Sequence, residues 1–247
     1  ELTVTGLTGV DKIYNGTTTA TVSGTAALSG IVNSDDVSIS GTHVFTFADA
    51  NAGTSKPITA SGFTLSGTDA GNYTLAQPTG LTATISKADQ TINTIATTVS
   101  KTFGDATYSI ATTASSGLAV TYTSSNTAVA TVAANGTVTI VGGGTASLTA
   151  SQSGNGNYNA APSVTQALTV GKGSQAITLE STATKTTADA PYTLTQNASS
   201  GLAITYTSSN PAVATISGNT VTIVGVGTTT ITANQAGNAN YNAAPEV

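Results

Sequence analysis

Residues 115–126 of the chain read Ser-Ser-Gly-Leu-Ala-Val-Thr-Tyr-Thr-Ser-Ser-Asn, and residues 199–210 read Ser-Ser-Gly-Leu-Ala-Ile-Thr-Tyr-Thr-Ser-Ser-Asn. Eleven of these twelve positions are identical, and the offset between the two copies is 84 residues. A second motif, Gly-Asn-x-Asn-Tyr-Asn-Ala-Ala-Pro, begins at residue 154 and again at residue 237, an offset of 83. Self-similarity at a nearly fixed offset indicates one structural unit that occurs twice.

The pattern inside each copy has a period of two residues. Apolar positions alternate with threonine, alanine or serine along residues 118–123, 137–140, 146–150 and 164–170. Such alternation, with β-branched threonine on the outer face, is typical of half-buried β-strands. Turn sequences such as Asn135-Gly136 and Gly142-Gly143-Gly144 separate the alternating stretches, which favours a β-sandwich.

The repeat also divides the chain into parts. We predict an all-β fold of three tandem β-sandwich domains, covering residues 1–87, 88–172 and 173–247. The linkers at 86–89 and 170–173 are short, which predicts that the domains follow one another in an extended rod. Val247 is the counterpart of Val164, so we expect the last domain to lack its final strand and to have an open sheet edge.

The composition excludes several classes of function. The 247 residues contain 52 Thr and 26 Gly, but only 6 Lys, 11 Asp or Glu and no Arg, Cys, Met or Trp. Without Cys there are no disulfides and no thiolate metal sites. Six scattered Lys at a net charge of −5 do not supply the phosphate contacts that nucleic-acid binding needs.

The same composition bears on location. No uninterrupted apolar run reaches the roughly 18 residues of a membrane span, so we expect no membrane insertion by this chain. The start, residues 1–4, lacks the basic and apolar regions of a signal peptide. Cys and Met are the most oxidisable side chains, and their absence suits an extracellular setting.

Two family resemblances follow from the motifs. Residues 122–150 carry Tyr-x-Ser-Ser-Asn-x-Ala-Val-Ala-Thr-Val from 122, Gly-x-Val-Thr from 136 and Gly-Thr-Ala-x-Leu-Thr-Ala from 144. This pattern resembles the bacterial immunoglobulin-like repeat of surface adhesins and intimin-type proteins, and the last copy matches it through Ala233. Residues 12–18 and 67–75 resemble the so-called YDG repeat, with Asn15 in place of the Asp that names it.

The resemblance implies immunoglobulin-like domains at the cell surface or outside the cell. It implies a structural stalk or spacer in a long modular adhesin, such as the gliding-motility adhesins exported by the type 9 pathway. Its partners would be neighbouring repeats of the same polypeptide, with surface glycans or proteins as further candidates. The alternative hypothesis is that one unit, residues 1–87 in the first place, is itself a carbohydrate- or protein-binding module.

The sequence predicts no catalytic site and no bound cofactor. His43 is the only imidazole, and it lies in an alternating stretch, residues 41–47, that reads as a strand. A Ser-His-Asp triad would need a serine and a carboxylate placed around it, and nothing in the sequence indicates that placement. We therefore interpret His43 as a strand residue and predict that the chain is not an enzyme.

Carboxylates offer candidates only for calcium. Asp35 and Asp36 lie in a turn before a predicted strand, and Asp49 or Asp69 could join them. Calcium needs six or more oxygen ligands, and none of these residues matches the spaced acidic loop of a helix–loop–helix site. We favour an ordinary turn and predict no metal.

The two Gly-Asn-x-Asn-Tyr-Asn loops, 154–159 and 237–242, allow two interpretations. Clustered Asn amides beside a Tyr could hold a sugar. Asn and Gly also tolerate left-handed turns, and Tyr158 and Tyr241, like Tyr73 in the first unit, could plug the end of a sandwich. Their recurrence in every unit favours the structural interpretation.

Overall fold

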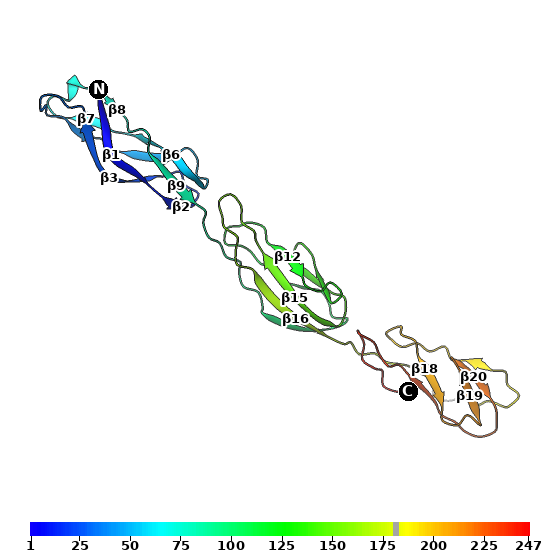
Figure 1. The fold of residues 1–247 in the computed structure, drawn as a ribbon. Helices are drawn as coiled ribbons and strands as arrows, with labels where there is room; N and C mark the ends of the chain where they lie inside the picture. The colour runs from blue at the N-terminus through cyan, green and yellow to red at the C-terminus, as the bar shows by residue number, and fades with distance from the viewer. Residues whose placement is uncertain (180–182) are drawn as a thin grey trace. The chain divides into compact units, whose positions relative to one another are not determined.

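A computed structural model describes residues 1–179 and 183–247 and shows a chain built of β-strands (Figure 1). Its contacts divide it into two compact units. Unit 1 comprises residues 1–93, 113–120 and 151–162, and unit 2 comprises residues 94–112, 121–150 and 163–247. We refer to residues 1–87, 88–172 and 173–247 as the first, middle and last segments.

The first segment lies in unit 1 and forms three sheets. The three-stranded sheet has the order β3 (Thr21–Ser29), β1 (Leu2–Val10), β8 (Leu75–Ala76). The four-stranded sheet has the order β2 (Lys12–Ile13), β9 (Thr82–Ser86), β6 (Gly53–Ser61), β5 (Val44–Phe47). A two-stranded sheet pairs β4 (Ser38–Ser40) with β7 (Thr64–Ser66), and a 3-10 turn, η1, spans Ala70–Asn72.

The core of this segment lies on the inner face of the four-stranded sheet. It is a cluster of buried side chains with partly buried neighbours: Ala20, Phe47, Ile58, Ala83, Ile85, Tyr14, Phe45, Ala52 and Leu81. In the other sheet, β1 shifts its register against β3 between Thr5 and Leu7. Gly6 lies at the shift with a φ of 80°, and a Cβ there would lie 2.3 Å from the carbonyl oxygen of Thr25, so only glycine fits.

The middle segment has two facing sheets. One has the order β10 (Thr98–Thr102), β16 (Val164–Gly171), β15 (Gly144–Ser151), β12 (Thr121–Ser124). The other has the order β11 (Tyr108–Ser109), β14 (Thr137–Ile140), β13 (Ala130–Val132). Val138 of the second sheet and Leu148 and Leu168 of the first belong to one buried cluster, so the two sheets enclose a single core.

The last segment repeats this plan with fewer strands among the described residues. One sheet has the order β17 (Tyr192–Thr193), β20 (Thr220–Ile223), β19 (Ala214–Ser217). The other pairs β18 (Thr205–Ser208) with β21 (Ile231–Asn234). Its buried cluster is built from Ile177, Ala198, Ala233 and Ala244, three of which are alanines.

The predicted fold class is confirmed, because strands dominate the described residues and pack as sandwich layers. The period of two is visible in the burial of β15 and β16, where Ala146, Leu148 and Ala150 face the core, as do Leu168 and Val170. The assignment of residues 118–120 to a strand is wrong. Their burial alternates as predicted, but the strand begins at Thr121.

Candidate functional site

The terminal strands of the middle segment lie side by side and run parallel. In the register of β10 and β16, Thr98 is opposite Ala167 and Thr102 is opposite Gly171. Further backbone hydrogen bonds extend the pair at both ends, from Phe103 N–H to the Gly171 oxygen and from Ala167 N–H to the Thr97 oxygen, each 2.8 Å.

This pairing sets the direction in which tension on the chain would load the two strands. The chain enters β10 at its Thr98 end and leaves β16 at the opposite end, after Gly171. A pull on both sides of the segment therefore draws the two strands in opposite directions along their length. Because the hydrogen bonds of a parallel ladder are evenly spaced, they share this load and must break together.

Gln166 ties the same strand pair to its surroundings. Its side chain lies in the inward row of β16 and is only 2% exposed, although it is polar. Its Nε2 donates a hydrogen bond to the Ala96 oxygen at 3.0 Å, and its Oε1 accepts one from the Tyr108 hydroxyl at 2.9 Å. Burial raises the pKa of Tyr108, so its hydroxyl keeps the proton that it donates.

The first segment contains a shorter pair of the same kind. β2 and β9 run parallel, with Lys12 opposite Ile85 and Ile13 opposite Ser86. Tyr14 N–H donates to the Ser86 oxygen at 2.8 Å. The Asp11 carboxylate accepts a hydrogen bond of 2.6 Å from Thr84 N–H, which extends the contact by one more residue.

In the last segment, the strand pairing reaches Val247. Ala233 and Val247 exchange two backbone hydrogen bonds, of 2.7 and 3.2 Å, as Ala150 is paired with Val164 in the middle segment. Within residues 183–247 this sheet has two strands, whereas its counterpart in the middle segment has four. The described part of the last segment therefore contains no pair equivalent to β10 and β16.

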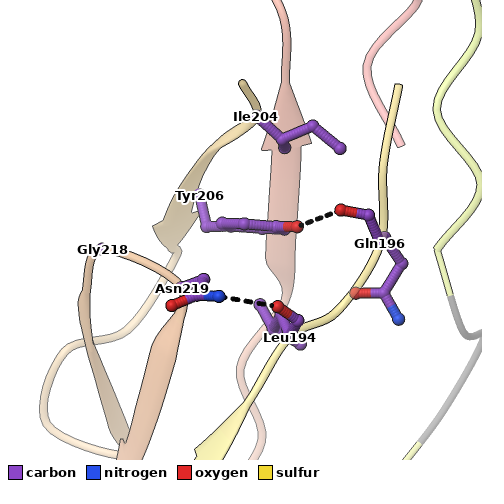
Figure 2. Close-up of a pocket in the computed structure, with 6 residues that line it drawn as sticks. All are labelled: Leu194, Gln196, Ile204, Tyr206, Gly218 and Asn219. Atoms are coloured by element: carbon purple, nitrogen blue, oxygen red, sulfur yellow. Dashed lines mark hydrogen bonds between the residues drawn. The ribbon is translucent and has the colours of Figure 1, made fainter. Parts of the chain in front are cut away.

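A pocket of about 290 Å³ lies in the last segment (Figure 2). Its lining residues are Leu194, Gln196, Ile204, Tyr206, Gly218 and Asn219. The Tyr206 hydroxyl lies 3.5 Å from the main-chain oxygen of Gln196, and Asn219 Nδ2 donates to the Leu194 oxygen at 3.0 Å. The side-chain Oε1 of Gln196 is buried and has no hydrogen-bond partner among the described residues.

Comparison with the middle segment explains this pocket. Ile110 and Tyr122, the counterparts of Leu194 and Tyr206, pack in one cluster with Leu168 of β16. The pocket thus lies where the middle segment has a packed apolar cluster, and we interpret it as part of the sandwich interior rather than as a small-molecule site.

A buried polar network holds the end of the middle segment. Gln90 Nε2 donates to Gln152 Oε1 at 2.5 Å and to the Asn159 oxygen at 2.7 Å. Gln175, Gln235 and Asn242 repeat these contacts in the last segment. Sequence analysis missed these glutamines, although Gln152 and Gln235 recur at the repeat offset of 83 and Gln90 and Gln175 at a similar offset of 85, a signal that could have identified them.

The tyrosines of the Asn-rich loops make aromatic contacts with the preceding segment, which the sequence did not predict for Tyr158 and Tyr241. The Tyr158 ring meets Tyr14 of the first segment edge-on, with 5.3 Å between ring centroids. The Tyr241 ring meets Phe103 of the middle segment in the same way, at 5.2 Å. Tyr73 differs, because its hydroxyl donates to Asp35 at 2.7 Å, and this hydrogen bond raises the pKa of Tyr73.

Three of the four calcium candidates lie in two neighbouring loops of the first segment. Asp69 accepts a hydrogen bond from Asp36 N–H at 2.9 Å, Asp36 accepts two from Thr68, and Asp35 accepts one from Tyr73. These carboxylates bind protein donors. In residues 1–179 and 183–247, no three acidic or His side chains are grouped so that they could hold a metal ion.

The fourth candidate, Asp49, forms an ion pair instead. Lys56 Nζ lies 2.5 Å from its carboxylate, and Asn51 N–H donates to the same oxygen at 2.8 Å. The hydrogen bond from Lys56 holds the pKa of Asp49 below its ordinary value, and the bond from Asn51 adds to the effect. That the chain binds no calcium stays a prediction.

His43 lies directly before β5 rather than within a strand. Its ring stacks on Phe63, with 3.8 Å between centroids and 6° between planes. Nε2 lies 3.3 Å from the Ser40 main-chain oxygen, which only accepts hydrogen bonds, so Nε2 is the protonated nitrogen. This arrangement gives His43 a packing role.

Comparison with known families supports both resemblances. Residues 1–80 match the family model of the YDG domain, and residues 105–154 match that of the intimin immunoglobulin-like domain. For the last segment, the resemblance rests on the internal repeat. The chain is thus adhesin-like in both matched regions, which supports a surface-associated adhesive or structural role. Modules of these kinds are generally not enzymes.

No curated protein matches the chain. Among solved structures, Drosophila N-cadherin EC1-4 is 10% identical, with 94% of this chain and 71% of that chain covered and a TM-score of 0.32. Mouse protocadherin-24 EC1-3 is 14% identical, with coverages of 96% and 94% and a TM-score of 0.32. Domains 4–9 of the surface layer protein SbsC are 19% identical, with coverages of 100% and 46% and a TM-score of 0.29.

The described part of the chain holds no helix whose length and hydropathy would let it traverse a bilayer.

Proposed function

We propose that the chain is a load-bearing stalk segment of a long modular adhesin, which holds a binding region away from the cell surface. The observation that supports this most directly is the parallel pairing of β10 with β16, repeated on a smaller scale by β2 and β9. A stalk must resist tension along the chain. A strand pair that is pulled in shear resists tension because several hydrogen bonds must break at the same time. Forced unfolding is governed by the unfolding rate, which this geometry slows.

Single-molecule force spectroscopy tests the proposal through a matched set of variants. Phe103 N–H bonds to β16, and because a parallel ladder uses alternate residues, Lys101 N–H faces β16 as well. Ser100 N–H faces the open side, since β10 is an edge strand. Lys101→Pro should lower the unfolding force of one domain, whereas Lys101→Ala and Ser100→Pro should leave that force near the wild-type value. Equal forces in all four proteins would contradict a load-bearing role for this pair.

The proposal includes an extended arrangement of the three segments and export by the type 9 pathway. Small-angle scattering should give a radius of gyration of roughly 25–30 Å, against about 18 Å for a compact globule of this length. Export is supported by the family resemblance alone. It is tested by asking whether the protein reaches the cell surface when the type 9 translocon of the source organism is inactivated.

The alternative function, ligand binding by residues 1–87, is separated from the stalk role by a glycan array probed with the whole chain. A stalk should bind no glycan. Specific binding that is lost when residues 1–87 are removed would support the alternative.

A further inference from the structure

The two Gly-Asn-x-Asn-Tyr-Asn loops each contact the segment that precedes their own. Residues 151–162 belong to the same compact unit as residues 1–93, although most of the middle segment belongs to the other unit. The second loop, residues 237–242, lies in unit 2 with residues 94–112 and 121–150. Each contact can therefore be followed within a single unit.

The first loop contacts the first segment through the side-chain amide of Asn157 and the ring of Tyr158. Asn157 Oδ1 accepts a hydrogen bond from Ala52 N–H at 2.9 Å, and Asn157 Nδ2 donates to Asn51 Oδ1 at 3.0 Å. The adjacent Tyr158 ring meets Tyr14 at an interplanar angle of 78°. The Asn157 amide, which accepts a hydrogen bond from a backbone N–H, thus lies next to an edge-to-face aromatic pair.

The second loop repeats two of these contacts, the hydrogen bond to the Asn Oδ1 and the aromatic pair, with unrelated residues. Asn240 and Tyr241 follow Asn157 and Tyr158 at the repeat offset of 83. Asn240 Oδ1 accepts a hydrogen bond from Gly143 N–H at 2.9 Å. Tyr241 meets Phe103 at an interplanar angle of 84°. The loop sequence is repeated while its acceptors differ, so the same interaction is built twice.

The linker between segments is bound by the same loops. Ala88 N–H donates to the Asn157 oxygen and the Ala88 oxygen accepts from Asn159 N–H, both at 2.9 Å. Gly173 makes the equivalent pair of bonds with Asn240 and Asn242, at 2.8 and 2.9 Å. A Cβ at Gly173 would lie 2.8 Å from the Phe103 oxygen, so this linker position has no room for a side chain.

The residues that contact a loop differ in type from their counterparts in the last segment. A Cβ on Gly143 would lie 2.6 Å from the Ala239 oxygen, so the bound loop requires glycine there. The counterpart of Gly143 in the last segment is Val226, which is 95% exposed. The counterpart of Phe103 is the exposed Thr187. The end of the last segment thus has a side chain at the position of Gly143 and no aromatic ring at the position of Phe103.

We propose that this loop is a docking element that recognises the end of the preceding repeat, by pairing an Asn amide with an open backbone N–H and a Tyr with an aromatic ring. Its partner is a sandwich end that presents a Tyr or Phe beside a turn with an open backbone N–H. This goes beyond the stalk role, since it concerns recognition between repeats whatever the whole protein binds.

Amide hydrogen exchange, measured by NMR on the full chain, tests the proposal with two reciprocal variants. Asn240→Ala should speed exchange at Gly143 about tenfold or more and leave Ala52 unchanged. Asn157→Ala should do the reverse. Each variant is the control for the other, because each removes one side chain whose hydrogen bonds reach only the preceding segment.

A steric pair of variants adds a second readout. Gly143→Ala should shift the ring resonances of Tyr241 and Phe103, whereas Gly156→Ala, where a Cβ meets nothing within 4 Å, should shift neither. Unchanged exchange at both amides would overturn the proposal. Faster exchange at both amides in each variant would also overturn it, since the loops would then act only on general stability.

Discussion

Gln90 and Gln152 share a side-chain hydrogen bond of 2.5 Å inside the middle segment, where they are 3% and 9% exposed. The pair is fully engaged, because Gln152 Oε1 also accepts from Gly154 N–H and Gln90 Oε1 accepts from the Ser116 hydroxyl. Buried amides are costly unless their polar groups are paired. These bonds fix the start of the Asn-rich loop relative to the sandwich.

Removing one partner should therefore destabilise one segment selectively. Gln152→Ala removes one of the two acceptors of Gln90 Nε2 and the acceptor of Gly154 N–H, so it should lower the free energy of unfolding of the middle segment by about 1–3 kcal/mol. Gln235→Ala should have the same effect on the last segment. Urea unfolding followed by segment-specific NMR signals measures both. If Gln152→Ala weakens the last segment as much as the middle one, the assignment of the network is wrong.

Extending the last segment should stabilise it. Adding Thr-Gln-Ala-Leu-Thr-Val after Val247 supplies counterparts of Leu168 and Val170, which are 1% and 4% exposed. Burial of two such side chains contributes about 3–6 kcal/mol at most, so the melting temperature of the last transition should rise. Thr-Gln-Ala-Ser-Thr-Ser, with the same length and no large apolar side chains, is the matched control. An equal effect of the two extensions would show that the pocket beside Tyr206 is not filled by this strand.

Calcium should not change stability. The carboxylates of Asp35, Asp36 and Asp69 are engaged by Tyr73, Thr68 and the Asp36 N–H. Melting curves with excess calcium and with EDTA should therefore coincide. A ligand that binds the folded state at 100 times its dissociation constant adds about 2.7 kcal/mol, so a bound calcium would be visible as a clear shift.

The Tyr73–Asp35 contact should be lost at alkaline pH. The hydrogen bond to Asp35 raises the pKa of Tyr73 in the folded chain above its unfolded value of about 10. The stabilisation is therefore fully present below pH 10 and is lost as the pH rises through the folded pKa. Tyr73→Phe should be less stable than wild type at pH 7, and the difference should shrink above pH 10. A difference that does not change with pH would mean that the phenol proton contributes nothing.

Local pattern predicts the strands well where one face of a sheet is buried. Leu148 and Ala150 alternate with Ser147 and Thr149, and the structure buries both apolar side chains completely. Alternation has a single explanation there, because a slip of one residue would expose every apolar side chain of the strand. The match of Val247 with Val164 agrees with the structure, because Val247 pairs with Ala233 as Val164 pairs with Ala150.

The features most relevant to function depend on contacts between distant residues. Gln166 occupies an inward position. This position tolerates a polar side chain because Ala96 and Tyr108 form hydrogen bonds with its amide, and neither residue is near Gln166 in sequence. The aromatic acceptors Tyr14 and Phe103 lie in dissimilar surroundings, so no local motif marks them. Periodicity shows which way a side chain points but not what it meets.

The contacts of the Asn-rich loops with the preceding segment have a consequence for the order in which the segments fold. Each loop lies near the C-terminal end of its segment, whereas its acceptor, Ala52 or Gly143, lies in the segment made before it. Synthesis proceeds from the N-terminus, and domains fold as they emerge. If the segments fold in the order of synthesis, Tyr14 belongs to a formed surface before Tyr158 is available, and the same holds for Phe103 and Tyr241. We therefore expect vectorial assembly, in which each repeat folds against one that is already complete.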